Sequence, residues 1–258
     1  IPGPAGDIGA RLYREAPEPS ALLVYFHGGG WVLGDLEVSD AACRFLAANA
    51  GLAVLSVDYR LAPEAPFPAA VDDAVAAFRY AVEHAAEFGA DPAAIGVAGE
   101  SAGGNLAAVV SQVTTRETGA APAFQLLFFP VTDLSTKHRS YSLFSEGFFL
   151  TESQMDWYKA RYLTDPGEAL DPRVSPLLAT DLSGLPPAYI AVAGFDPLRD
   201  EGEAYAARLK QAGVPVSVRR HSGLIHGIIN ATGVGHAGRD VLLEAAGALR
   251  VGLTAHAG

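Results

Sequence analysis

Six largely apolar segments of strand length alternate with segments of helical periodicity along most of the chain. The strand-length segments are 21–26, 53–59, 95–98, 124–130, 188–194 and 214–220. A continuous apolar run is typical of a strand covered on both faces, as in a parallel sheet flanked by helices. Helices are expected between these runs and after the last one, at 40–48, 69–88, 105–111, 201–212 and 238–251. Such strand–helix–strand units predict an α/β fold with one mostly parallel, doubly wound sheet and right-handed crossovers.

The alternation stops between residues 131 and 178, where aromatic residues gather in an irregular stretch. One helix is expected there, at 152–162. We interpret 131–178 as a partial helical cap inserted into a single domain that spans 1–258, where it would give a bound molecule an apolar wall. The alternative is a satellite hydrophobic cluster under a long loop.

Composition narrows the classes of protein to which the chain can belong. With 18 Lys and Arg against 29 Asp and Glu, the formal net charge is −11, which disfavours a nucleic-acid partner. A single cysteine, Cys43, excludes an internal disulfide and a thiolate metal cluster. No apolar run approaches the roughly 18 residues of a membrane span. The first residues show no signal-peptide pattern, so a cytoplasmic location is expected, although the chain opens on Ile1 and says nothing of what precedes it.

The run at 95–98 ends in the motif Gly-Glu-Ser-Ala-Gly at 99–103, and a helix-favouring segment follows. A sharp strand-to-helix turn crowds the backbone, and Gly99 and Gly103 remove the Cβ atoms that would clash on either side of Ser101. The Ser101 hydroxyl would then project at the carboxyl edge of the sheet, beside a helix N-terminus, as a nucleophile does. The alternative is that residues 99–103 form a glycine-rich turn with no catalytic role. Glu100 is expected to bond neighbouring loops and not to act as an acid or base.

A second candidate feature follows the run at 21–26, where His27 precedes three glycines, Gly28, Gly29 and Gly30. Three consecutive glycines cost chain entropy, which makes a plain connection a poor explanation for them. Because glycine has no side chain in the way, the backbone N–H groups of these residues can approach a ligand closely. Together with the N–H of Ala102 they would form an oxyanion hole, in which each donor contributes about 3–4 kcal/mol in the transition state.

A serine nucleophile needs a base, and His226 is the candidate. Hydrolases with this strand-turn-helix motif place their groups in the chain order serine, acid, histidine, which leaves only histidines after the run at 188–194. His221 belongs to the end of the last strand, and His236 and His256 lie within or beyond the last helical region. His226, followed by Gly227, lies in the loop between them, where it would take and return the Ser101 proton.

The acid that orients this histidine is expected to be Asp196, which follows the strand at 188–194 directly and precedes Pro197. Its carboxylate would hold the imidazole tautomer and stabilise the imidazolium. Asp200 is the alternative, but it is expected to start a helix as a cap or first-turn charge. Elsewhere, Arg60 and Glu64 lie four residues apart and are expected to form an ion pair that pins their loop.

Five motifs in order resemble those of the hormone-sensitive-lipase-like (bacterial family IV) esterases of the α/β-hydrolase superfamily. They are His-Gly-Gly-Gly-Trp at 27–31, Asp-Tyr-Arg-Leu-Ala-Pro-Glu at 58–64, Gly-Glu-Ser-Ala-Gly-Gly at 99–104, Asp-Pro-Leu-Arg-Asp at 196–200 and His-Gly at 226–227. The resemblance covers nearly the whole chain. It implies cofactor-free hydrolysis of small carboxylic esters of short to medium acyl length.

Carried over motif by motif, the resemblance gives Ser101, Asp196 and His226 the catalytic positions, and Gly28–Gly30 with Ala102 the oxyanion hole. It also implies a homodimer through the last strand and helix, at 214–220 and 238–251. The chain departs from the pattern at Glu100, where many relatives have Asp, and at Ile228, where they have an aromatic residue. The family usually has N-terminal helices that complete the cap, and this chain would start about where they end.

Two other functions are compatible with these motifs. An amidase or a deacetylase would use the same catalytic groups as an ester hydrolase. A non-catalytic ligand receptor on the same fold is disfavoured, because the receptors that resemble this family have lost the histidine that His226 matches.

Overall fold

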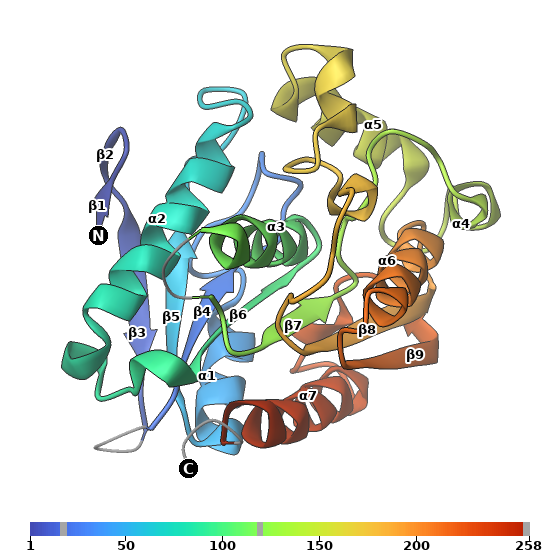
Figure 1. The fold of residues 1–258 in the computed structure, drawn as a ribbon. Helices are drawn as coiled ribbons and strands as arrows, with labels where there is room; N and C mark the ends of the chain where they lie inside the picture. The colour runs from blue at the N-terminus through green and yellow to red at the C-terminus, as the bar shows by residue number, and fades with distance from the viewer. Residues whose placement is uncertain (16–19, 118–120, 255–258) are drawn as a thin grey trace.

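In the computed structural model, which describes residues 1–15, 20–117 and 121–254, a seven-stranded sheet lies between two layers of helices (Figure 1). The strand order is β3-β5-β4-β6-β7-β8-β9, and only β3 runs antiparallel to its neighbour. The strands are β3 (Gly9–Tyr13), β4 (Leu22–Phe26), β5 (Ala53–Asp58), β6 (Ile95–Glu100), β7 (Gln125–Phe128), β8 (Ala188–Phe195) and β9 (Val216–Ile225). A small hairpin, β1 (Pro2–Gly3) and β2 (Gly6–Asp7), precedes them. The predicted α/β fold with a mostly parallel sheet is confirmed.

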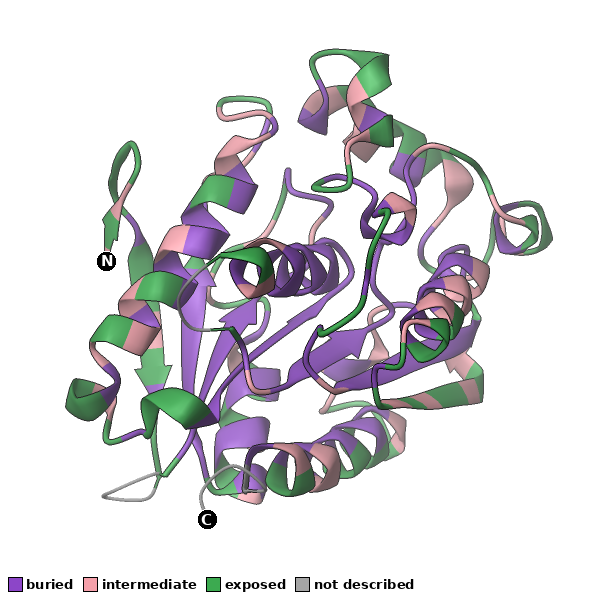
Figure 2. Cartoon of the chain, viewed as in Figure 1, coloured by how far each residue is buried: buried purple, intermediate pink, exposed green. Residues whose placement is uncertain are grey.

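Helices cover both faces of the sheet because strand residues point alternately to either side. The helices are α1 (Asp40–Ala50), α2 (Ala69–Glu83), α3 (Ala102–Arg116), α4 (Arg139–Leu143), α5 (Glu152–Tyr162), α6 (Arg199–Gln211) and α7 (Ala237–Thr254). Leu22, Val24 and Phe26 of β4 belong to the buried cluster that also contains residues of α2, α3 and α6. Leu23 and Tyr25 belong to the cluster on the other face, which contains residues of α1 and α7. Figure 2 shows β4 to β8 buried, with exposure concentrated on the outer faces of the helices and on the edge strands.

Several bounds differ from those expected. Helix α3 starts at Ala102, directly after the turn, and not at residue 105, because the backbone of Ser101 alone makes the reversal. Helix α2 ends at Glu83, and a 3-10 turn, Ala85–Phe88, carries the chain on to the left-handed Gly89. Strand β9 continues to Ile225, beyond residue 220, since an edge strand accepts polar residues that a buried strand excludes.

The segment between β7 and β8 holds α4, α5 and two 3-10 turns, Pro166–Leu170 and Pro176–Leu178. Helix α5 has the bounds expected from the sequence, and a capping box of Thr151 and Gln154 fixes its start. In Figure 1, α5 lies at the upper right of the view and α4 at its right edge. Among the described residues, no helix has the length and apolar character that a membrane crossing needs.

Candidate active site

Ser101 occupies a strained turn between β6 and α3, with φ 58° and ψ −119°. A Cβ at Gly99 would lie 2.3 Å from Gly103, and one at Gly103 would lie 1.9 Å from the carbonyl oxygen of Phe26. Both glycines are therefore required for the close approach of helix and strand, as the sequence predicted. The Ser101 N–H donates to the Phe128 carbonyl at 2.9 Å, which fixes the turn against β7.

The structure brings Ser101 together with His226 and Asp196. The Ser101 Oγ lies 2.9 Å from His226 Nε2, and His226 Nδ1 lies 2.8 Å from Asp196 Oδ2. A carboxylate only accepts hydrogen bonds, so this geometry puts the imidazole proton on Nδ1 and leaves Nε2 to accept from the serine hydroxyl. The second Asp196 oxygen accepts from the Leu198 N–H at 2.9 Å, which orients the buried carboxylate. Gly227, left-handed at φ 74°, turns the chain just after the histidine.

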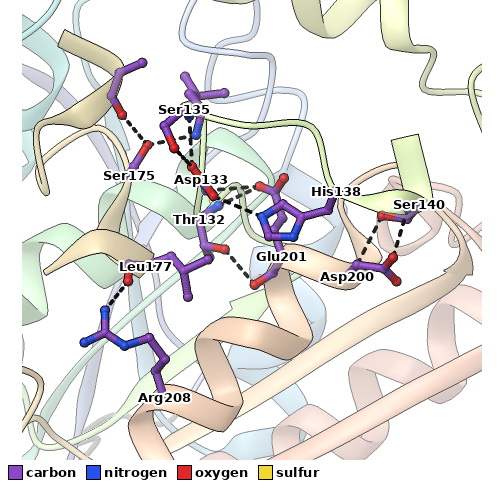
Figure 3. Close-up of polar contacts among 12 residues, drawn as sticks. Thr132, Asp133, Ser135, His138, Ser140, Ser175, Leu177, Asp200, Glu201 and Arg208 are labelled. Carbon is purple, nitrogen blue, oxygen red and sulfur yellow. Dashed lines mark hydrogen bonds and ion pairs between the residues drawn. The ribbon is translucent and has the colours of Figure 1, made fainter. Parts of the chain in front are cut away.

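The alternative acid, Asp200, belongs to the first turn of α6 and accepts from the Ser140 N–H at 2.9 Å (Figure 3). It also accepts from Arg199. The Ser140 hydroxyl donates to the Pro197 carbonyl. Asp200 therefore ties the segment that contains α4 to the loop that carries Asp196, and within the described residues it has no hydrogen bond to His226.

Glu201, which the sequence did not single out, lies next to this link and is fully buried. Its Oε1 accepts from the N–H groups of Thr132 at 2.8 Å and Asp133 at 3.3 Å, while the Thr132 hydroxyl donates to the Glu201 carbonyl at 2.8 Å (Figure 3). Burial raises the pKa of Glu201 well above its usual range. The sequence could not identify Glu201 as buried. Its only distinguishing feature there is that it follows Asp196 by about one helical turn, and a surface glutamate could occupy the same place.

Other histidines lie away from these groups. His221 is in β9 with its Nε2 buried and, within the described residues, without a hydrogen-bond partner; burial lowers its pKa. His236 directly precedes α7, whereas His256 lies outside the described residues. His27 stacks on Tyr59 with ring centroids 4.3 Å apart.

The backbone N–H groups of the three glycines do not all have the same role. Gly29 at φ 116° and Gly30 at φ 62° have backbone conformations that favour glycine, and within the described residues their N–H groups have no acceptor. Ala102 is the first residue of α3, where an N–H has no intrahelical partner. The Gly28 N–H, in contrast, donates to Glu100 Oε1 at 3.0 Å. This differs from the expectation that all three glycines supply oxyanion donors.

Glu100 is a buried acceptor for several loops, as expected. Besides Gly28, it accepts from the hydroxyls of Tyr25 and of Ser39, the latter at 2.7 Å, and from the Asn230 amide at 3.3 Å. A buried carboxylate is tolerated only when donors surround it. Burial, together with the charge of Glu100, raises the pKa of Tyr25 well above its usual range. Glu100 thus joins the glycine loop to the loop that follows His226.

The prediction that Arg60 forms an ion pair with Glu64 is wrong. Arg60 pairs with Asp73 of α2, with Nη2 to Oδ1 at 2.7 Å and Nε to Oδ2 at 2.8 Å, and its N–H also donates to Asp73. Asp73 is buried at the inner side of α2, whereas Glu64 is exposed. Bidentate pairing with a buried carboxylate is stronger than a bond to an exposed one.

A pocket of about 330 Å³ opens over Ser101 and His226. Its other walls are mainly apolar side chains from the segment between β7 and β8. They are Phe129, Val131, Phe149, Leu150, Met155 and Tyr158. Gln154 and Asn230 add neutral polar groups. Glu100 also lines the pocket, but protein donors occupy its carboxylate oxygens, and no Lys or Arg occurs among the described lining residues. The pocket therefore suits an uncharged, largely apolar molecule.

Comparisons with known proteins identify the family. Residues 23–230 match the family described as the α/β hydrolase fold. The carboxylic ester hydrolase LipN of Mycobacterium tuberculosis is 52% identical over 98% of this chain and 69% of its own length. The ethyl acetate hydrolase of Pseudomonas putida is 42% identical over 84% of this chain and 70% of its own length.

Solved structures give the same result. The crystal structure of EstE1, a thermophilic and thermostable carboxylesterase cloned from a metagenomic library, superposes with a TM-score of 0.95 at 43% identity, covering 98% of this chain and 87% of EstE1. On the motifs, the fold and these relatives, the chain belongs to the hormone-sensitive-lipase-like carboxylic ester hydrolases of the α/β-hydrolase superfamily.

Proposed function

We propose that this protein hydrolyses carboxylic esters of short to medium acyl length through an acyl-enzyme on Ser101, with His226 as base and Asp196 as the acid that orients it. The observation that carries the proposal is the pair of hydrogen bonds, at 2.9 and 2.8 Å, that joins the serine hydroxyl to the buried carboxylate through one imidazole. The apolar pocket above it suits a neutral ester.

In the proposed reaction, Ser101 Oγ attacks the ester carbonyl while His226 Nε2 takes its proton. Asp196 keeps the proton on Nδ1 and stabilises the imidazolium without being protonated itself. The ester oxygen becomes an oxyanion, for which we assign the donors to the N–H groups of Gly29, Gly30 and Ala102. Each contributes about 3–4 kcal/mol to the transition state.

The tetrahedral intermediate collapses when His226 returns its proton to the leaving alkoxide, and the alcohol departs. Water then attacks the acyl-enzyme with His226 again as base, which releases the carboxylic acid and restores Ser101. In the proposal no cofactor takes part. Gly28 would serve the oxyanion hole indirectly, since its bond to Glu100 fixes where the next two glycines lie.

Three further features belong to the proposal. The segment 131–178 would act as the substrate cap of a single domain spanning 1–258, since several of its side chains line the pocket. A homodimer would form through β9, an edge strand with an unpaired side, and α7, where Val251 is exposed. We also propose a cytoplasmic location.

Replacing Ser101 with Ala tests the function. We expect turnover of p-nitrophenyl acetate to fall by several orders of magnitude while circular dichroism stays unchanged. A fluorophosphonate should label the wild type at one residue per chain and leave the variant unlabelled, which a non-catalytic receptor would not do. A matched p-nitroanilide measures amidase activity: faster turnover of the anilide than of the ester would reassign the reaction. Retention of most esterase activity by Ser101→Ala would refute the proposal.

A further inference from the structure

Two tyrosines of helix α5, Tyr158 and Tyr162, lie one turn apart and contact the loop that carries the proposed oxyanion donors. We call residues 27–34 the oxyanion loop. The Tyr158 ring lies so close to Gly30 that a Cβ there would be 2.2 Å from its Cγ. Tyr162 stacks on Trp31 with ring centroids 4.2 Å apart and an interplanar angle of 4°. Residues at i and i+4 share one face of a helix, so this face of α5 contacts two successive residues of the loop.

Trp31 has a backbone conformation that needs external support. Its φ is 61°, in the left-handed region that a residue with a bulky side chain rarely adopts. Its carbonyl accepts from the Ala62 N–H at 2.8 Å, while its indole Nε1 is buried and has no hydrogen-bond partner in the described part of the chain. Packing on the faces of the ring, and not a hydrogen bond to it, therefore holds the side chain.

Tyr162 is well fixed for this role. It is fully buried, and its carbonyl accepts from the Phe67 N–H at 2.8 Å while the Phe67 ring meets it edge-on at 5.9 Å. Its phenol oxygen has no hydrogen-bond partner in the described residues. The contribution of Tyr162 to the loop therefore comes from its ring and not from its hydroxyl.

We infer that Tyr162 is a positioning residue for the oxyanion hole: by stacking on Trp31 it keeps the preceding Gly29 and Gly30 N–H groups directed at the reacting carbonyl. The inference rests on the proposed function. It also links substrate contact to catalysis, because Gln154, Met155 and Tyr158 of the same helix line the pocket. A shift of α5 would therefore move both the pocket wall and the oxyanion donors.

The test compares Tyr162→Phe with Tyr162→Leu. Phenylalanine keeps the stacked ring and loses only the unpartnered hydroxyl, so we expect wild-type kinetics. Leucine removes the flat ring, and we expect kcat for p-nitrophenyl butyrate, counted per fluorophosphonate-reactive serine, to fall 10- to 100-fold, below the 10²–10³ typical of deleting a whole donor. KM should stay within about threefold and the pH profile of kcat should keep its shape, since the His226–Asp196 pair is untouched.

A matched control removes a stacked tyrosine elsewhere. Tyr80 of α2 stacks at 3.9 Å on His84, which directly follows the helix, and neither lines the pocket. Tyr80→Leu should therefore leave kcat unchanged. If Tyr162→Leu does not fold, Trp31→Leu removes the same stack from the other side and should give the same fall in kcat at constant KM.

The inference is overturned if the folded leucine variant has wild-type kcat per reactive serine and only a lower melting temperature, or if Tyr162→Phe loses as much activity as Tyr162→Leu. A wild type with no esterase activity would instead refute the proposed function, so the two failures are distinguishable.

Discussion

His226 Nε2 lies 2.9 Å from Ser101 Oγ although 125 residues separate the two in sequence. The bond joins a loop after the edge strand β9 to a turn at the centre of the sheet. Both residues follow carboxyl ends of parallel strands, where an open α/β sheet gathers its chemistry. The role of each residue on these loops can therefore be tested by a single substitution.

Asp196→Asn should reduce kcat for p-nitrophenyl acetate by about 10⁴, because an amide in this place favours the wrong imidazole tautomer. Its KM should change little, since Asp196 does not line the pocket. Asp200→Asn is the matched control, because asparagine can still accept from Ser140, and it should keep wild-type kcat. Steady-state kinetics on both variants decide the assignment, and the reverse ranking would make Asp200 the acid.

Gly29→Ala should lower kcat by about 10²–10³, the effect of losing an oxyanion donor. At φ 116° the new Cβ would lie 2.1 Å from the Leu33 carbonyl, so the loop must shift. Gly51→Ala, at φ 70° with open space around it, should cost about 1–2 kcal/mol of stability and leave kcat unchanged. Kinetics and urea unfolding together separate the two effects, and equal kcat losses would contradict the assignment.

Glu201→Gln should gain stability relative to the wild type as pH rises. Because burial raises the pKa of Glu201 in the folded state, the wild type keeps its full stability below the unfolded value of about 4.5 and loses stability as pH rises through the folded pKa. Glutamine does not titrate and keeps an acceptor for Thr132. Urea unfolding at pH 4.5, 6 and 8 measures the difference, which would be constant if Glu201 had an ordinary pKa.

A leucine at the same position separates titration from hydrogen bonding. Glu201→Leu leaves the Thr132 and Asp133 N–H groups without their acceptor, at about 1–3 kcal/mol for each buried donor, at every pH. The same urea series should therefore show a loss for leucine already at pH 4.5.

Asp73→Ala should destabilise the protein by about 1.5–3 kcal/mol, because it removes a buried acceptor that takes several hydrogen bonds from Arg60. Glu64→Ala should stay within about 0.5 kcal/mol of the wild type, as is usual for an exposed side chain. Urea unfolding at pH 7 compares them. A larger effect at Glu64 would restore the pairing that the four-residue spacing suggested.

The fold could be predicted because its signals are local. Apolar runs located β4 to β8, and helix α5 has the bounds 152–162 that were expected from the sequence. The end of β9 could not be predicted, since an edge strand exposed to solvent can continue beyond residue 220 through polar residues that give no apolar signal. Helix α4 is too short to show a period.

The sequence by itself determined the nucleophile turn, the glycine loop and the positions of Ser101, Asp196 and His226 after their strands, because turn chemistry and strand ends depend on neighbouring residues. Only the tertiary structure decided which groups meet: Glu100 takes the N–H of Gly28, and Tyr162 covers Trp31. These contacts join residues 72 and 131 positions apart, and no local pattern encodes a pairing that arises when separate elements pack together.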